Sequence, residues 1–298
     1  MSAFKSGFIT VVGLPNAGKS SLVNALVGES VSIVTAKPQT TRKRTLGILT
    51  KQDCYQMIFV DTPGVIESNN GLNSYLKNEL SRSLKDVDVI VVAVAPWEFQ
   101  TNDHPWGAQL VTSKPIIYIA TQCDKRLKDQ SLETTIPEKW KNWELGQTLP
   151  ILTSARTKLG FQELIIKILD HLPEGPPYYG EDLYTPQTMR EISTEVVRKY
   201  CFEFLHQEIP YGLAVKIQKF ETKAPLTKIE ADIIITKESH KGMVIGNGGK
   251  VLREIGTRAR QELESILNSK VFLKLHVSVK PHWLKDKQWL EELGYGSN

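Results

Sequence analysis

Cysteine, histidine and methionine are scarce in this chain, and long apolar runs are missing. The 298 residues include three cysteines, six histidines and four methionines. Cys54, Cys123 and Cys201 lie far apart and form no CxxC pair, which argues against a disulfide framework or a zinc site and fits a reducing compartment. The longest apolar run, residues 87–95, is interrupted by Asp88 and is too short to cross a bilayer. The first residues lack the pattern of a signal peptide, so we expect none.

The chain also lacks a large excess of charge of either sign. Its 37 basic and 33 acidic residues leave a net charge of +4, so a function that needs positive charge must depend on a local cluster. The contents of 41% hydrophobic and 23% charged residues are typical of globular proteins and exclude disordered, collagen-like and coiled-coil classes. The length predicts two domains.

The first half alternates short Val- and Ile-rich runs with helix-like stretches. We expect strands at 8–12, 45–49, 56–60, 89–95, 116–120 and 150–152, and helices at 20–27, 72–84, 132–143 and 161–171. Short apolar runs separated by helices are typical of a mostly parallel sheet with helices on both faces. The pattern therefore predicts an α/β fold for residues 1–172.

The second half follows a different order. Residues 173–186 hold four prolines and two glycines, and we interpret them as a linker between domains. Beyond it, residues 187–298 predict a helix at 188–206, strands at 213–220 and 228–235, a glycine-rich turn, a helix at 250–267, a strand at 271–280 and a short last helix. Trp283 and Trp289 are spaced as on a helix and are expected to pack against it.

A phosphate-binding loop directly follows the first predicted strand. Residues 13–20 match GxxxxGK[ST] between a strand and a helix, as this motif requires. Its backbone N–H groups and the following helix N-terminus are expected to hold phosphates, Lys19 to reach the β and γ phosphates, and Ser20 to bind Mg²⁺. The loop consists of Gly13, Leu14, Pro15, Asn16, Ala17, Gly18, Lys19 and Ser20.

Two further loops are expected to complete the phosphate side of the site. Asp61, Thr62, Pro63 and Gly64 follow an apolar strand, where Asp61 can hold Mg²⁺ through water and Gly64 can donate its N–H to the γ-phosphate. The polar loop 37–42 carries two threonines that can supply a Mg²⁺ ligand.

The nucleotide base is expected to bind at the ends of two later strands. GTPases commonly have Asn-Lys-x-Asp after the strand at 116–120, and this chain has Thr121, Gln122, Cys123 and Asp124. The Asp124 carboxylate can accept hydrogen bonds from guanine, whereas Thr121 and Gln122 replace the usual Asn and Lys. Those changes predict an affinity lowered roughly tenfold or more. Ser154 and Ala155 match the Ser-Ala that presents an N–H to the guanine oxygen, and Cys123 is interpreted as a small buried filler.

Hydrolysis is expected to be slow. Val65 occupies the position after Gly64, where Ras-type GTPases carry a water-orienting Gln, and valine cannot orient water. Asn16 points to another source of positive charge, because GTPases with Asn there can hold K⁺ beside the phosphates. We therefore expect slow turnover that K⁺ or a partner stimulates.

A second glycine motif lies in the other half. Gly246 to Gly249 form GxxG before a predicted helix, and glycines let a sugar–phosphate backbone approach closely. Residues 237–260 hold six basic and two acidic side chains, which equals the net charge of the whole chain. This arrangement is typical of a type 2 KH domain, an α+β fold that binds about four single-stranded nucleotides. The residues expected to contact RNA are Lys241, Gly246, Asn247, Gly248, Gly249, Lys250 and Arg253.

Together these motifs resemble the Era family of bacterial GTPases over essentially the whole chain. The resemblance is carried by GLPNAGKS, KPQTTR, DTPGV, TSA, HKGMVIGNGGKVLREIG and the final WLKDKQWLEELGY. It implies a cytoplasmic GTP/GDP switch that binds the 3′ end of small-subunit ribosomal RNA, assists assembly of the small ribosomal subunit and attaches in part to the inner membrane. It also implies that Thr41 is the Mg²⁺-binding switch threonine. We expect a monomer.

Two alternatives stay open. TQCD and Val65 favour an RNA-binding assembly chaperone whose nucleotide site is weakened and whose catalysis is incidental. An RNA-modification GTPase would have a similar first half, but the GxxG domain and the lack of a Cys-based catalytic module argue against it.

Overall fold

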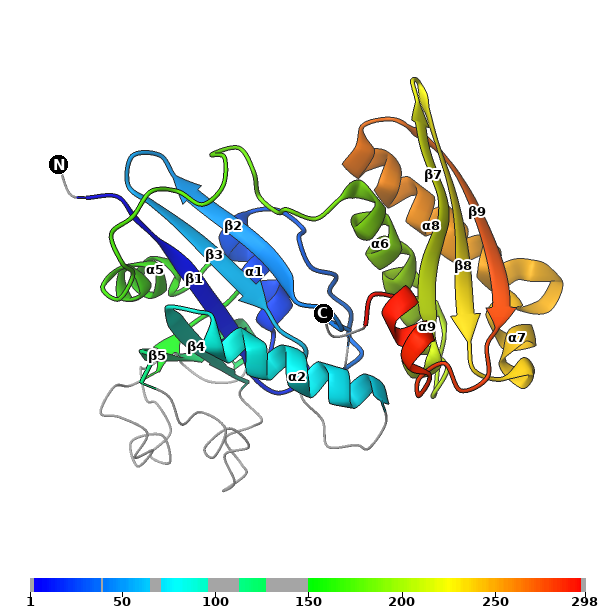
Figure 1. Cartoon of the computed structure of the whole chain (residues 1–298), viewed down its shortest axis with the longest axis horizontal. Coiled ribbons are helices and arrows are strands. Elements are labelled where there is room, and N and C mark those ends of the chain that lie inside the picture. The colour runs from blue at the N-terminus through cyan, green and yellow to red at the C-terminus, as the bar shows by residue number, and fades with distance from the viewer. Residues whose placement is uncertain (1–2, 39, 65–70, 96–112, 127–149, 296–298) are drawn as a thin grey trace. The chain divides into compact units, whose positions relative to one another are not determined.

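The computed structural model describes residues 3–38, 40–64, 71–95, 113–126 and 150–295. These residues form two units (Figure 1). The first comprises Met1–Ser32, Thr41–Ile66 and Asn78–Pro186, and the second comprises Ile33–Thr40, Glu67–Lys77 and Gln187–Asn298. Two short segments from the first half of the chain therefore fold within the second unit. The helix expected at 132–143 lies outside the described residues.

A six-stranded sheet forms the centre of the first unit. Its order is β2-β3-β1-β4-β5-β6, and only β2 and β3 pair in antiparallel fashion among these strands. β3 and β4 are buried along their whole length, which fits the apolar runs Met57–Val60 of β3 and Val89–Val94 of β4; Gln56 and Asp61 are buried polar residues near the two ends of β3. The strands are β1 (Lys5–Val12), β2 (Thr45–Lys51), β3 (Tyr55–Asp61), β4 (Val89–Val94), β5 (Ile116–Ala120) and β6 (Ile151–Leu152).

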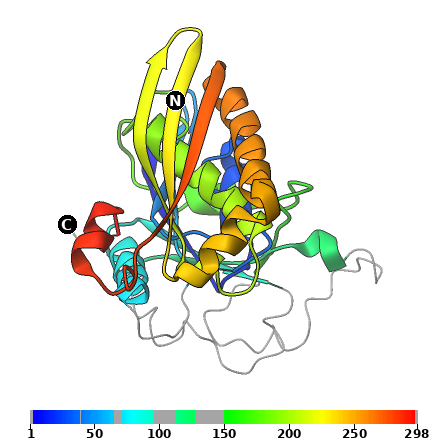
Figure 2. The same cartoon turned by 90° about the vertical axis from the view of Figure 1, so that its right-hand side faces the viewer.

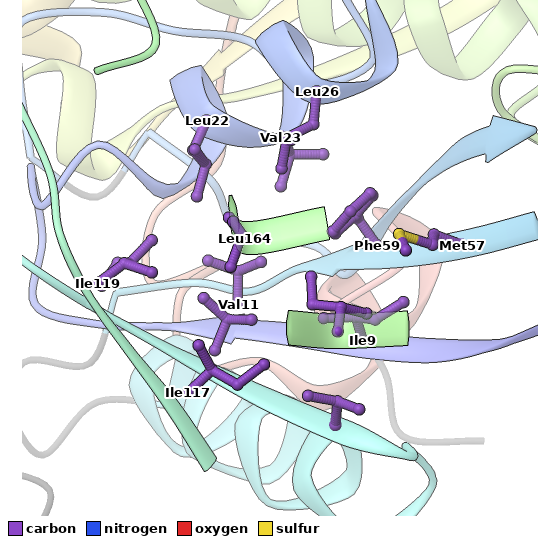
Figure 3. Close-up of a cluster of buried hydrophobic side chains, with 14 of the residues drawn as sticks. Ile9, Val11, Leu22, Val23, Leu26, Met57, Phe59, Ile117, Ile119 and Leu164 are labelled. Atoms are coloured by element: carbon purple, nitrogen blue, oxygen red, sulfur yellow. The ribbon is translucent and has the colours of Figure 1, made fainter. Parts of the chain in front are cut away.

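Helices cover both faces of this sheet. On one face, α1 (Lys19–Val27) and α5 (Phe161–Leu169) pack their apolar sides on the strands, and Figure 3 shows Leu22 and Leu164 over Val11. On the other face, α2 (Gly71–Lys85) contributes Leu84 to a second apolar cluster. This layering confirms the predicted α/β class with a mostly parallel sheet. It leaves the carboxyl ends of the parallel strands to carry the functional loops.

The second unit is a three-stranded sheet with helices. β7 (Ala214–Lys223) and β8 (Leu226–Ile235) are antiparallel, and β9 (Lys270–Val279) runs parallel to β8. α6 (Met189–Phe204) and α8 (Lys250–Leu267) pack on one face of this sheet (Figure 2). They bury alternate residues of β8, from Ile229 to Ile235. Thr188 begins α6 with a capping box to Glu191, which satisfies two free backbone donors.

The other face of this small sheet is partly covered by the end of the chain. Trp283 is fully buried beside Ala214 and Ile234, and its indole Nε1–H donates to the Gly212 carbonyl at 3.1 Å. Trp289 of α9 (Lys287–Glu292) belongs to the same cluster. Both tryptophans therefore pack as expected.

Two described α-helices were not predicted from the sequence: α3 (Cys123–Arg126), a single turn after β5, and the helix that precedes the GxxG loop. Glu238–Ile245 form α7 immediately before the GxxG loop, and only a glycine-rich turn was expected there. The segment is short, carries Gly242 in its middle and has no side-chain cap, so its local helix signal is weak. Burial of Val244 and His240 in the second unit holds it helical.

The proline-rich segment 173–186 packs against the rest of the first unit. The side chain of Gln56 is fully buried, and its Oε1 accepts hydrogen bonds from the N–H groups of Tyr178 and Tyr179 at 2.8 and 2.9 Å. Gln56 Nε2 donates to the Tyr179 carbonyl at 2.9 Å. One side chain therefore satisfies three backbone groups of a segment that has no regular structure. None of the described helices combines the length and the apolar character that a membrane span needs.

Candidate functional site

The loop between β1 and α1 requires glycine at two positions. A Cβ on Gly13 would lie 2.3 Å from the Ala93 carbonyl oxygen, closer than any real contact. Gly18 has φ +86°, a left-handed conformation that side chains disfavour. The loop geometry therefore explains both glycines without reference to a ligand, and it leads directly into the N-terminus of α1, where anions are stabilised.

Lys19 is buried within this loop. Its ammonium group donates to the carbonyl oxygens of Gly13 and Leu14 at 3.0 and 2.9 Å, and its side chain is 6% exposed. These two carbonyl groups of the loop therefore point toward the Lys19 side chain. The positive charge is thereby held at the loop, where it can interact with a bound phosphate.

Three oxygen-bearing side chains meet beside Lys19. The hydroxyl oxygens of Ser20 and Thr41 lie 2.9 Å apart, and Thr41 Oγ1 lies 3.5 Å from Asp61 Oδ2. Ser20 lies in the first turn of α1, Thr41 belongs to the loop before β2, and Asp61 ends β3. The parallel strands β1 and β3 end at this edge of the sheet and the antiparallel β2 begins at it, which brings the three side chains together.

Asp61 lacks a full set of partners. It is completely buried, and its Oδ1 has no hydrogen-bond partner among the described residues. Burial raises the pKa of its carboxyl, while the hydroxyl of Ser20 and the charge of Lys19 act in the opposite direction. A buried carboxylate oxygen without a partner, next to two hydroxyls, is the hard-oxygen donor set that Mg²⁺ prefers. The three residues fit a Mg²⁺ ion.

The residues after Asp61 have different surroundings. The Thr62 hydroxyl donates to the Val11 carbonyl at 2.7 Å and is buried, so this side chain anchors the loop to β1. Gly64 lies against the phosphate loop, because a Cβ there would lie 2.9 Å from the Pro15 Cα. Its backbone can therefore approach the phosphate loop closely. Pro63 is buried, and Val65 lies outside the described residues.

The four residues expected to bind the base stand at the end of β5. Asp124 accepts a hydrogen bond from the Ser154 hydroxyl at 2.8 Å, which joins the loops after β5 and β6. Cys123 is buried, as expected, and its N–H donates to the Thr153 carbonyl. Ala155 follows Ser154 and is half-buried.

Thr121 and Gln122 have contacts that the sequence did not suggest. The Thr121 hydroxyl donates to the Ala17 carbonyl at 2.6 Å, and Gln122 Nε2 donates to the Asn16 carbonyl at 2.9 Å. Both bonds join the loop after β5 to the phosphate loop, across the intervening strand β4. The sequence offered one indication of these contacts, which is that both side chains carry hydrogen-bond donors.

The GxxG loop joins α7 to α8 in the second unit. Gly246 has φ +75°, and a Cβ there would lie 2.5 Å from Val251 Cγ2, so this glycine is required by packing. Gly248 and Gly249 also have positive φ, but a Cβ on either would meet no atom of the described residues within 4 Å. The open side of the loop is therefore accessible to a ligand backbone.

Basic and apolar side chains border this loop. Lys250 and Arg253 are exposed on the first turn of α8, and neither forms an ion pair with the described residues. Lys241 lies 3.8 Å from Glu238 across one turn of α7. Met243, also on α7, is 53% exposed. Close backbone access, positive charge and an apolar side chain together suit single-stranded nucleic acid.

Other candidate ligands are sparse in the described residues. These residues contain no group of three His, Cys, Asp or Glu side chains that could hold a metal. His240 is buried, and its Nε2 lies 3.3 Å from Glu208. Among the described residues, the Asp61 carboxylate with the Ser20 and Thr41 hydroxyls is therefore the oxygen cluster that best suits a cation.

Two family descriptions match the two units. Residues 8–122 match the family described as 50S ribosome-binding GTPase, and residues 208–284 match the KH domain. The first match covers the phosphate loop 13–20, the loop 61–64 and the first two of the residues expected to bind the base, Thr121 and Gln122. The second covers the GxxG loop with α7, α8 and all three strands of the small sheet.

Whole proteins are similar as well. The chain is 41% identical to the GTPase Era of Clostridium perfringens over 295 residues, which is 98% of both chains. It is 37% identical to the GTPase Era of Neisseria meningitidis over 294 residues, 98% of this chain and 95% of that one. These matches extend across both units and the segment between them.

Two solved structures of Era are similar to this one. A variant of Aquifex aeolicus Era bound to GDP·AlF₄⁻ has a TM-score of 0.93 with 33% identity, covering 98% of this chain and all of that one. Era in complex with MgGDPNP and nucleotides 1506–1542 of 16S ribosomal RNA has a TM-score of 0.92 with 33% identity, covering 99% and 100%. The first unit is thus a P-loop GTPase domain, and the second holds a KH domain.

Proposed function

The chain belongs to the Era family of GTPases, and from this premise we propose that it uses GTP to control how it binds ribosomal RNA. In this proposal it binds GTP with Mg²⁺, hydrolyses GTP slowly, binds the 3′ end of small-subunit ribosomal RNA through its KH domain and assists assembly of the small ribosomal subunit. The observation that carries it is the similarity over 99% of the chain to Era bound to MgGDPNP and 16S ribosomal RNA.

The nucleotide lies, in this proposal, along the carboxyl edge of the large sheet. Loop residues 13–20 hold the phosphates, Lys19 and the Gly64 N–H contact the γ-phosphate, and Asp124 with the loop 154–155 selects guanine. Thr62 contributes by anchoring the loop, since its hydroxyl is bonded to Val11. Bound Mg²⁺ neutralises phosphate charge, and Ser20, Thr41 and Asp61 are the residues that hold it.

The source of the slow rate is the position after Gly64. Val65 carries no group that can orient a water molecule. Asn16, in the middle of the phosphate loop, has a left-handed backbone conformation with φ +65°. We propose that K⁺ beside Asn16 supplies positive charge during hydrolysis. Single-turnover rates in KCl and NaCl test this, and equal rates would remove the K⁺ from the proposal.

RNA binding is assigned to the GxxG loop. Gly248 and Gly249 leave open space for a sugar–phosphate backbone, while Lys250, Arg253 and Lys241 supply positive charge. Asn247 is exposed within the same loop and offers an amide for hydrogen bonds to bases. These contacts support single-stranded RNA as the ligand.

A switch also needs a link between nucleotide and RNA. Within the second unit, Lys37 Nζ donates to the carbonyl oxygens of Phe202 and Leu205 at the C-terminal end of α6. Four residues further along the chain, Thr41 contacts Ser20 in the first unit. We propose that the segment 37–41 carries the effect of the γ-phosphate and Mg²⁺ toward the KH domain. Its structural support is that one short stretch of backbone is bonded at both ends.

The test is a titration of the whole protein with fluorescent GTP, GDP and ATP analogues, with and without an RNA of the small-subunit 3′ end. A scrambled RNA of equal length is the control. We expect GTP and the specific RNA to strengthen each other's binding by roughly 5- to 150-fold, the range typical of coupled sites. Affinities that do not depend on the second ligand would contradict the switch.

A second function is favoured by the TQCD sequence at the base site. An RNA-binding assembly chaperone with a weakened nucleotide site would bind the RNA equally well with or without nucleotide. Nucleotide affinities weaker than millimolar in the same titration would support this alternative and contradict the proposed switch.

The remaining parts of the proposal concern organisation and place. We propose that residues 1–172 form the GTPase domain, 173–186 the linker and 187–298 the KH domain with its last helix, and that the protein is a monomer in the cytoplasm. Peripheral attachment to the inner membrane is tested by sedimentation with anionic vesicles at physiological salt. Sedimentation equilibrium tests the monomer.

A further inference from the structure

Helix α7 leads directly into the GxxG loop but has little local support of its own. It is eight residues long, its N-cap Lys237 forms no side-chain cap, and Gly242 lies within it. Helices this short are marginal by themselves, and an internal glycine lowers their stability further. The position of the helix therefore depends on the contacts that hold it against the rest of the second unit.

The loop follows any movement of this helix. The Gly246 N–H donates to the Gly242 carbonyl at 2.8 Å, and the Gly249 N–H donates to the Gly246 carbonyl at 3.0 Å. Gly246 also packs so closely on Val251 of α8 that no Cβ fits between them. Because the loop is bonded to the last turn of α7, the angle of α7 sets where the loop lies.

Two buried side chains on one face of α7 hold it in place. His240 and Val244 are four residues apart and are 6% and 0% exposed. Val244 belongs to the apolar core of the second unit, and such packing has no preferred direction. The Nε2 atom of His240 lies 3.3 Å from Oε1 of Glu208. A carboxylate only accepts hydrogen bonds, so this contact needs the proton on Nε2 and fixes the direction of the ring.

The partner of His240 stands on a separate, well-ordered turn. The Glu208 carbonyl accepts hydrogen bonds from the N–H groups of Tyr211 and Gly212 at 3.2 and 3.3 Å. The pKa of the Glu208 carboxyl lies below its ordinary value, chiefly because its own backbone N–H donates to it, and the charges of His240 and Lys237 add to this effect. An ionised carboxylate is thus held in position where α7 passes.

We propose that His240 and Glu208 are positioning residues for RNA binding, because their contact sets the angle at which α7 presents the GxxG loop. Neither belongs to the residues proposed to contact RNA, so they act through the backbone of α7. Without the contact, only a fraction of the molecules holds the loop in the binding arrangement, and the affinity for RNA falls by that fraction. This inference rests on the proposed binding of RNA at the GxxG loop.

The sign of the effect distinguishes positioning from charge. Removal of an acidic side chain near an RNA site strengthens binding when the side chain acts only by repelling phosphates. Positioning predicts the opposite for Glu208. We expect Glu208→Ala to weaken RNA binding by about 3- to 10-fold, as for one lost hydrogen bond. The loss should persist at high salt, where charge effects fade.

Glu238 provides a matched control on α7 itself. Its side chain is 75% exposed and lies 3.8 Å from Lys241, whereas that of Glu208 is 63% exposed. Both substitutions by alanine therefore remove one exposed negative charge. Glu238→Ala is expected to bind RNA as tightly as the parent or more tightly, because it releases Lys241 and breaks no contact of α7 with another segment.

Substitutions of His240 separate the donor from the space it fills. Glutamine places its amide nitrogen as many bonds from the backbone as Nε2 of histidine, so His240→Gln keeps the donor, whereas His240→Met fills the space without one. We expect His240→Met to weaken RNA binding by about 3- to 10-fold and His240→Gln to bind within about twofold of the parent. The double variant His240→Met with Glu208→Ala should lose no more than either single variant, since both remove the same contact.

The experiment measures fluorescence anisotropy of a labelled RNA of the small-subunit 3′ end with the whole protein. Thermal unfolding shows whether each variant is folded, and amide hydrogen exchange of residues 238–246 reports the anchoring of α7. Exchange there should be faster in Glu208→Ala and His240→Met and return to the parent rate in His240→Gln. Unchanged or tighter RNA binding by folded Glu208→Ala and His240→Met would overturn the inference while the proposed RNA binding stood. A parent protein that binds no RNA would overturn both.

Discussion

The hydroxyl oxygens of Ser20 and Thr41 lie 2.9 Å apart, and they join the start of α1 to the loop before β2. The same Thr41 oxygen lies 3.5 Å from Asp61, at the end of β3. Three segments that are distant in the sequence thus place oxygens around one point. Binding of a metal ion at this point would therefore depend on the position of the loop that carries Thr41.

Removal of the Thr41 hydroxyl should weaken Mg²⁺-dependent GTP binding. We expect Thr41→Val to lower GTP affinity in Mg²⁺ by roughly tenfold, since one oxygen ligand is lost, while GTP affinity in EDTA is unchanged. Thr41→Ser keeps the oxygen and should bind as the parent does. Titrations of a fluorescent GTP analogue in Mg²⁺ and in EDTA measure the difference. A similar loss in Val and Ser variants would show that the methyl group, and not the oxygen, matters.

Neutralising Asp61 should stabilise the protein that lacks metal and remove its response to Mg²⁺. An uncompensated buried group costs about 1–3 kcal/mol, so Asp61→Asn should raise the nucleotide-free Tm by roughly 2–4 °C for each kcal/mol recovered. Added Mg²⁺ with GDP should then raise the Tm of the parent more than that of the variant. A lower Tm for Asp61→Asn without nucleotide would contradict the prediction.

The same carboxyl predicts a pH dependence. Burial raises the pKa of Asp61 in the folded state, so the folded protein binds this proton more tightly than the unfolded chain does. Its contribution to the free energy of unfolding therefore increases as pH falls through the raised pKa toward the ordinary range of Asp, and is lost again as pH rises. Tm profiles of parent and Asp61→Asn, measured without Mg²⁺, should converge toward acid pH. Parallel profiles would exclude Asp61 as the source.

Gln56 should hold the linker on the first unit. Gln56→Met leaves the N–H groups of Tyr178 and Tyr179 without their acceptor, at a cost of about 1–3 kcal/mol. We expect a lower midpoint in urea and faster proteolysis within residues 173–186. Gln162→Met on the exposed face of α5 is the control, and cleavage at the same rate in both variants would argue against this role.

Charge at the GxxG loop should decide RNA affinity. Gly248 has φ +60° and open space around it, so Asn and Asp can both replace it, with similar strain. Gly248→Asp places a negative charge where a phosphate is expected and should weaken RNA binding by roughly tenfold more than Gly248→Asn. Fluorescence anisotropy of a labelled RNA measures both at several salt concentrations. Equal affinities would mean that no phosphate lies near Gly248.

Lys37 should transmit the state of the nucleotide. In Lys37→Met the carbonyls of Phe202 and Leu205 lose their common donor, while the residues proposed to contact nucleotide and RNA are unchanged. We expect the separate affinities for GTP and for RNA to change less than about threefold, and the coupling between them to fall below the 1–3 kcal/mol typical of linked sites. Lys37→Arg, which keeps a cationic donor, should retain the coupling. Undiminished coupling in Lys37→Met would exclude this residue.

The most regular elements could be predicted from the sequence, whereas the contacts between loops could not. The apolar runs that became β3 and β4 are buried on both faces, so their residue types alone indicated central strands. Helix α7 was missed because its local signal is weak and burial of Val244 supplies what the sequence lacks. The bonds of Thr121 and Gln122 were missed because they join residues more than a hundred positions apart.

The sequence by itself determined the two motifs, their order and the residue types that can bind phosphate, Mg²⁺, guanine and RNA. Only the tertiary structure decided which of those residues meet. Ser20, Thr41 and Asp61 come together because β1 and β3 end, and α1 and the antiparallel β2 begin, at one edge of the sheet. β5 ends at the same edge, so the loop after it supplies donors to carbonyl groups of the phosphate loop. A motif is set by neighbouring residues in the chain, but a site is set by which chain segments pack side by side.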